Sequence, residues 1–162
     1  IKIEEKEGTK IIKNEKYGYR IEVPSDFFVV RTLSAENLLL ARANKKNNVC
    51  FPLQDNFFPD IELLVLENEK NLSLKDFVKE DIEKNVYLEE AIATSSIVKT
   101  KINEKEAFKF FIKNSSPFPQ EVFYYFSLPE KKVLQVSFNI WEKEPEKPRL
   151  ETLEKILQTL SF

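Results

Sequence analysis

The chain has 162 residues, of which 42% are hydrophobic and 32% charged, and its 25 basic and 27 acidic residues leave a formal net charge of −2. This length supports a single domain with a hydrophobic core of its own. The balanced charge excludes the strongly basic surface by which proteins bind nucleic acids. We therefore expect no nucleic-acid partner.

The rarest residues exclude several classes of enzyme. The chain has no histidine, which rules out a Ser-His-Asp triad, a Cys-His pair and any metal site with histidine ligands. Gly8 and Gly18 are the only glycines, so the sequence contains neither a GxGxxG motif nor a P-loop. The 14 phenylalanines and five tyrosines instead indicate a core of aromatic rings on β-sheets.

The first part of the chain reads as strands. Residues 1–9 are charged and are predicted to form a loose lead-in, with a single domain over residues 10–162. Residues 10–13 and 17–23 then form a hairpin, since Tyr17, Tyr19, Ile21 and Val23 alternate with other residues and give one buried face.

Pro24-Ser25-Asp26 ends this strand, because proline lacks a backbone donor and the three residues favour a turn. Ser25 and Asp26 could in principle be a nucleophile and an acid. No histidine can connect them, so we interpret them as a corner of the chain.

Residues 27–32 and 37–43 are predicted strands, although the second run could also be a helical turn. Residues 44–60 form a long irregular segment that is rich in asparagine but also apolar. Residues 60–67 are again a predicted strand. Residues 71–90 are the clearest helix, with Ser73 as the N-cap and an apolar stripe at helical spacing.

The C-terminal half alternates short strands with short connections. Residues 95–102, 105–114, 121–128 and 132–141 are predicted to form an antiparallel meander, because parallel neighbours need much longer crossovers. Residues 147–162 form a closing helix. The sequence thus predicts the α+β class, with a central antiparallel β-sheet flanked by helices on both faces.

The irregular segment holds the main candidate for a site. Phe51, Phe57 and Phe58, together with Phe118 in a later proline-containing turn, could form an apolar contact surface for a protein partner. The alternative is that the rings of the segment plug one end of the sheet and that Phe118 belongs to an ordinary turn.

Other candidates have simpler explanations. Asp55 and Asp60, with Gln54 and Asn56, offer oxygen ligands for calcium, but their spacing is not that of an EF-hand and a solvated turn explains them. Cys50 is best interpreted as a small buried hydrophobic residue. We therefore assign no catalytic residue, no metal ligand and no cofactor.

Several segments together resemble the PsbP-like family. They are "YGYRIEVPSDF" near the start, "ENEKNLSLKDFVKEDIEKN" in the middle, the strand pair "INEKEAFKFFI" and "LETLEKILQTLSF" at the end. The family includes the extrinsic PsbP subunit of photosystem II, a Ran-binding nuclear import factor and bacterial lipoproteins. The resemblance implies an α/β/α sandwich and binding or assembly work without a shared catalytic motif.

From this resemblance we expect a non-catalytic, extracytoplasmic binding or assembly module whose partner is another protein. Export and lipid anchoring through a segment outside this sequence are implied by the bacterial relatives. The chain is then not an enzyme. Two alternatives stay open: a carrier of a small apolar ligand between sheet and helix, and a hydrolase using Asp55 with Asp60 or Glu62.

Overall fold

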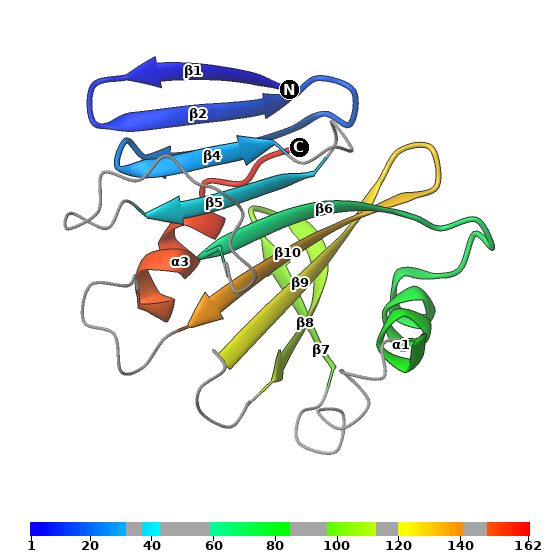
Figure 1. The fold of residues 1–162 in the computed structure, drawn as a ribbon. Helices are drawn as coiled ribbons and strands as arrows, with labels where there is room; N and C mark the ends of the chain where they lie inside the picture. Colours follow the sequence, from blue (N-terminus) through cyan, green and yellow to red (C-terminus); the bar gives the residue numbers. More distant parts are fainter. Residues whose placement is uncertain (32–36, 43–58, 85–96, 113–119, 141–148) are drawn as a thin grey trace.

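The computed structural model describes residues 1–31, 37–42, 59–84, 97–112, 120–140 and 149–162. Their strands form two sheets, one of three strands in the order β1-β2-β3 and one of seven in the order β4-β5-β6-β10-β9-β8-β7 (Figure 1). Helices α1 and α3 complete the described elements. The predicted α+β class is confirmed.

The small sheet begins almost at the first residue. Strand β1 (Lys2–Lys6) pairs antiparallel with β2 (Thr9–Asn14), so residues 1–9 are not the loose lead-in that the sequence predicts. Strands pair through backbone hydrogen bonds, so a strand can carry charged side chains on its solvent-exposed face. Glu4 binds Lys13 across the strands at 2.7 Å, while Ile1 and Ile3 pack against the core.

The predicted hairpin is confirmed in β2 and β3 (Tyr19–Pro24). Its turn extends to Gly18, whose φ of 71° suits glycine and whose backbone N donates to the Asn14 carbonyl at 2.8 Å. The strand therefore starts at Tyr19 instead of Tyr17. Tyr17, Tyr19 and the apolar residues that alternate along β3 are all buried, as predicted.

Ser25 and Asp26 form an exposed turn between β3 and β4 (Phe27–Arg31). The backbone N of Ser25 donates to the Gly8 carbonyl at 3.1 Å, and the Lys10 ammonium donates to the Phe27 carbonyl at 2.8 Å. These bonds hold the corner at which the chain passes from the small sheet to the large one. The interpretation as a corner is confirmed.

The large sheet is antiparallel at every described pairing. Its remaining strands are β5 (Leu38–Arg42), β6 (Ile61–Glu67), β7 (Val98–Ile102), β8 (Lys105–Ile112), β9 (Gln120–Leu128) and β10 (Lys132–Ile140). Strands β7 to β10 form the predicted meander. The sequence allowed either a strand or a helical turn for residues 37–43, and the structure has strand β5 there.

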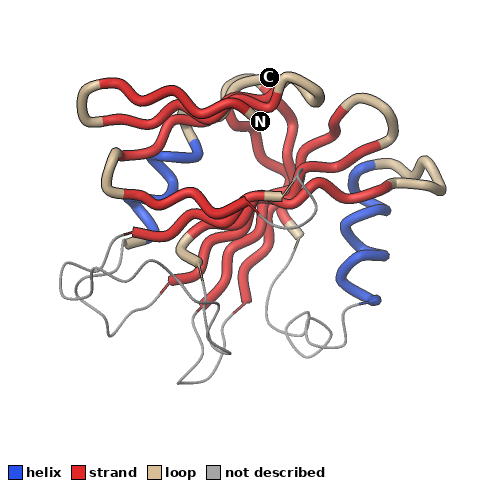
Figure 2. The backbone as a smooth tube through the Cα atoms, turned by 45° about the horizontal axis from the view of Figure 1, so that its top comes forward, coloured by secondary structure: helices blue, strands red, loops and turns tan. Residues whose placement is uncertain are grey.

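The two helices cover opposite faces of this sheet (Figure 2). Helix α3 (Leu150–Leu157) contacts β3 and β10 and packs into the core between the two sheets. Helix α1 (Leu74–Lys84) packs on the other face, against aromatic rings of β8 and β9. The prediction of helices on both faces is confirmed. On the face that carries α3, the small sheet also packs against the large one.

The layer under α1 is filled by rings. Phe110 and Phe123 stack with centroids 4.7 Å apart, and Phe77, Val78 and Ile82 of the helix pack above them. Alternate residues of a strand point to opposite faces, so Val122 and Tyr124, which flank Phe123 along β9, belong to the other core. The prediction of an aromatic core on sheets is confirmed.

Candidate functional site

The whole of the predicted contact surface lies outside the described residues. This applies to Phe51, Phe57, Phe58 and Phe118, and also to Cys50 and Asp55. The contact surface that these phenylalanines would form stays a prediction.

Asp60 is described, and it does not lie in a solvated turn. Its side chain is completely buried. Its backbone N donates to the Leu40 carbonyl at 2.9 Å, and its carbonyl accepts from the backbone N of Asn139 at 3.1 Å. These bonds tie Asp60 to the neighbouring strands β5 and β10 at the start of β6. The polar sequence around it concealed this pairing, so the prediction of a solvated turn was wrong for this residue.

Glu62 points to the face of the large sheet that carries α1. Burial raises the pKa of the Glu62 carboxyl, nearby Glu121 raises it further, and a hydrogen bond with Ser137 opposes both effects. The pair that the hydrolase alternative needs is not assembled among the described residues, because Asp55 lies outside them. Nor do their His, Cys, Asp and Glu side chains form a group of three able to hold a metal ion.

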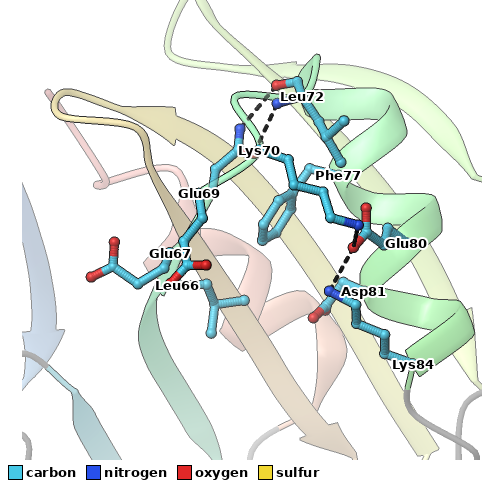
Figure 3. Close-up of a pocket in the computed structure, with 10 residues that line it drawn as sticks. Leu66, Glu67, Glu69, Lys70, Leu72, Phe77, Glu80, Asp81 and Lys84 are labelled. Atoms are coloured by element: carbon cyan, nitrogen blue, oxygen red, sulfur yellow. Dashed lines mark hydrogen bonds and ion pairs between the residues drawn. The ribbon is translucent and has the colours of Figure 1, made fainter.

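A pocket of about 290 Å³ lies between α1 and the connection from β6 to this helix (Figure 3). Its lining combines apolar side chains with charged ones from both elements. The lining residues are Leu66, Glu67, Asn68, Glu69, Lys70, Leu72, Phe77, Glu80, Asp81 and Lys84. Leu66 and Leu72 are partly buried and Phe77 is buried, so they form an apolar base beneath charged groups.

The connection that forms one wall is held in a fixed shape. Asn68 accepts a hydrogen bond from the backbone N of Leu72 and donates one to the carbonyl of the same residue, both at 2.9 Å. Asn71 adopts a φ of 52°, which asparagine tolerates better than most residues. Ser73 then caps α1 through its bond from the backbone N of Asp76, at 3.2 Å. The predicted N-cap is confirmed.

A buried polar cluster supports the pocket from the sheet. The Tyr125 hydroxyl donates to an Asp81 carboxylate oxygen at 2.8 Å, and Gln135 donates to the same oxygen at 3.3 Å. Gln135 also donates to the Tyr125 hydroxyl at 2.7 Å. Tyr125 is completely buried, so its ring and hydroxyl have a fixed position under the helix.

Burial perturbs the acid–base properties of this cluster. Burial raises the pKa of the Asp81 carboxyl, although the hydrogen bond from Tyr125 and the charge of Lys84 oppose it. Burial also raises the pKa of the Tyr125 phenol far above its ordinary value, and the Asp81 charge adds to this. Tyr125 therefore stays protonated and acts as a hydrogen-bond donor to the carboxylate.

An ion-pair bridge joins the two walls of the pocket. Lys70, on the connection, and Lys84, on α1, both bind one Glu80 oxygen, at 2.7 and 2.5 Å (Figure 3). These bonds lower the pKa of Glu80, and the bond to Glu80 raises the pKa of Lys84. Both lysines are thus held by a carboxylate of the pocket itself.

The sequence contained a signal for this site that our reasoning missed. Asp81 lies four residues after Phe77 and three after Val78, which places it on the apolar stripe of α1. Gln135 likewise interrupts the apolar run of β10, where it is buried. A polar residue on the buried side of each of two elements indicates that the two side chains meet.

The described architecture is that of an antiparallel α+β domain whose main sheet carries helices on both faces. It is similar to the solution structure of cyanobacterial PsbP (CyanoP) from Synechocystis sp. PCC 6803, with a TM-score of 0.59 over 95% of this chain and 92% of that chain. The sequence identity is 8%. The chain therefore has a PsbP-like fold, as the sequence resemblance implies. No protein-family model matches the sequence, nor does any curated protein.

Proposed function

We propose that this domain is a non-catalytic binding or assembly module that binds another protein, with the pocket between α1 and the β6–α1 connection as a contact surface. The proposal rests first on the PsbP-like fold, which matches cyanobacterial PsbP over nearly the whole of both chains. The family that the sequence resembles is one of binding and assembly proteins. That resemblance is also the reason for proposing an extracytoplasmic location.

One observation carries the choice of surface: the pocket has an apolar base, a charged rim and a rigid wall. Protein interfaces bury apolar groups at their centre and keep polar groups at the rim. Sites that are already rigid lose little conformational entropy when a partner binds. The pocket therefore suits one protruding side chain of a partner protein.

The described part of the chain does not contain a helix long and apolar enough to cross a membrane.

The proposed extracytoplasmic location can be tested directly by fractionating the native cells and detecting the full-length protein with an antibody. Recovery with the cytoplasmic fraction would contradict the proposed extracytoplasmic location.

The binding function can be tested by affinity capture of the full-length protein from its own cells. Leu72→Trp places a large ring in the pocket and should abolish capture of the partner. Leu150→Trp is the matched control, because Leu150 is also a partly buried leucine but lies at the start of α3, packed against the other core.

We expect the wild type and Leu150→Trp to capture the same protein, and Leu72→Trp to lose it while keeping its circular dichroism spectrum. Capture that survives in Leu72→Trp would show that the pocket is not the contact surface. Failure of the wild type to retain any protein reproducibly would contradict the binding function itself.

A further inference from the structure

Strand β7 forms one edge of the large sheet, at the end of the strand order (Figure 1). Among the described residues, β7 pairs with β8 and with no second strand. We propose that this edge receives an extended, acidic segment of a protein partner, which adds to the sheet as an antiparallel strand. None of the residues of β7 lines the pocket, so the inference does not depend on the contact proposed there.

The turn between β7 and β8 determines which backbone groups of β7 face outward. Its two residues both have positive φ, 45° and 67°, as in a two-residue hairpin turn. The flanking residues of such a turn, Ile102 and Lys105, exchange both backbone hydrogen bonds, and bonded and non-bonded pairs then alternate along the hairpin. Lys99 and Lys101 fall in the non-bonded pairs. Their N–H and C=O groups therefore point away from β8, where they can bind a further strand.

The side chains of the same two residues make this edge basic. Lys99 and Lys101 are exposed, and the alternation of a strand places both on one face of the sheet. Lys99 binds Glu106 at 2.5 Å in an exposed ion pair, whereas Lys101 forms no ion pair with a described residue. An added strand places its own residues directly opposite these lysines, where opposite charges stabilise the pairing. The charge of the edge thus favours an acidic segment.

The other edges of the described sheets suit such a segment less well. Strand β1 has the sequence KIEEK, and its two glutamates would repel carboxylates placed beside them. Strand β4 is mostly apolar, and its Phe27 carbonyl already accepts a bond from Lys10. Strand β3 is bridged at Arg20 to Ser161. Among the described edges, β7 combines two lysines with no acidic residue.

A second copy of the chain fits this edge poorly. When two β7 strands pair antiparallel and the faces of the sheet continue, each lysine can meet only a lysine. A twofold axis at Thr100, for example, places Lys99 opposite Lys101. Like charges directly opposite each other destabilise a strand pair, and lysines on an edge oppose self-association for this reason. A partner strand with carboxylates at these two positions removes the repulsion.

The other face of β7 adds an apolar contact and sets the direction of the preferred sequence. Val98 is 51% exposed and lies on the same face as the buried Ile102. An antiparallel strand runs past Lys101, then Lys99, then Val98. The preferred segment therefore has two acidic residues separated by one residue and followed by an apolar residue.

The inference can be tested with the peptide acetyl-Thr-Val-Glu-Thr-Glu-Val-Thr-amide, which has this pattern, and with a control peptide in which both glutamates are glutamines. Each is titrated into the isotope-labelled 162-residue chain, and amide shifts and amide hydrogen exchange are followed by NMR. At saturation the acidic peptide should slow exchange of the Lys99 and Lys101 amides roughly tenfold, because they gain hydrogen bonds. The control peptide should bind several-fold more weakly.

Two variants each remove one positive charge from an edge strand. Lys101→Gln keeps the backbone of β7 and should weaken binding of the acidic peptide several-fold. Lys6→Gln is the matched control, because Lys6 is also an exposed lysine of an edge strand but belongs to β1 in the small sheet. It should leave the binding unchanged.

Equal binding of the two peptides, unchanged binding in Lys101→Gln, or the lack of any saturable shift would overturn the inference. So would slow exchange of the Lys99 and Lys101 amides in the free chain, because their backbone groups would then already be bonded. None of these results concerns Leu72 or the pocket. A failure of the inference is therefore distinct from a failure of the proposed function, which is decided by capture of the partner.

Discussion

Tyr125→Phe removes one hydroxyl from the buried cluster and keeps the ring in place. The ring still packs against Phe110, whose centroid is 5.9 Å away, so the loss is confined to hydrogen bonds. Asp81 loses a donor and the buried Gln135 loses an acceptor. A hydrogen bond to a charged group contributes about 1.5–3 kcal/mol, so we expect the free energy of unfolding to fall by about 2 kcal/mol.

The change should also depend on pH. Burial raises the pKa of Asp81 above its value in the unfolded chain, while the Tyr125 hydrogen bond opposes this shift. A raised carboxyl pKa means that stability is highest below the unfolded pKa and is lost as pH rises through the folded pKa. Without the hydroxyl the pKa of Asp81 rises further. Tyr125→Phe should therefore be more destabilising near neutral pH than near pH 4.

Urea unfolding at both pH values, followed by circular dichroism, measures the effect. Tyr124→Phe is the control: Tyr124 is the next residue along β9, and its hydroxyl donates to Glu154 at 3.0 Å on the opposite face. Glu154 is only partly buried, so water can replace this donor and the loss should be about 1 kcal/mol or less. Equal losses for both variants, or no change with pH in Tyr125→Phe, would refute the role assigned to the cluster.

Three further predictions concern stability, each measured by urea unfolding. Glu104→Gly should stabilise the domain by about 0.5–1 kcal/mol, because Glu104 has a φ of 67° in the β7–β8 turn and glycine adopts it without strain; a loss would contradict this. Ser73→Ala removes the N-cap of α1 and should cost about 1 kcal/mol, whereas Ser73→Asp should not. Leu153→Ala leaves a cavity under α3 and should cost about 3 kcal/mol, and a loss below 1 kcal/mol would show that the site collapses.

Elements with a strong local pattern could be predicted from the sequence. The apolar stripe of α1 and the short connections after β7 and β9 depend on neighbouring residues, and the structure confirms them. The turn at Asn103-Glu104 brings both residues to positive φ, the geometry that suits a two-residue hairpin. Such features need no knowledge of distant parts of the chain.

Features that depend on pairing with another segment were not predicted. The charged β1 is a strand because β2 lies beside it, and nothing in its own residues indicates this. The N-terminal strands also form a separate sheet, because the corner at Ser25 and Asp26 turns the chain away before β4 begins. The candidate site was missed for the same reason, since Asp81 and Gln135 are 54 residues apart.

The position of the pocket follows from the order of the strands. Strand β10 inserts between β6 and β9, while α1 packs over β9 and β8, so the connection after β6 must cross the end of β10 to reach its helix. The hydrogen bond from the backbone N of Asn68 to the Lys131 carbonyl, 2.8 Å long, marks this crossing. The connection and the helix are thus attached to different strands, and the space between them is the pocket. A contact surface at this place would be a consequence of the topology.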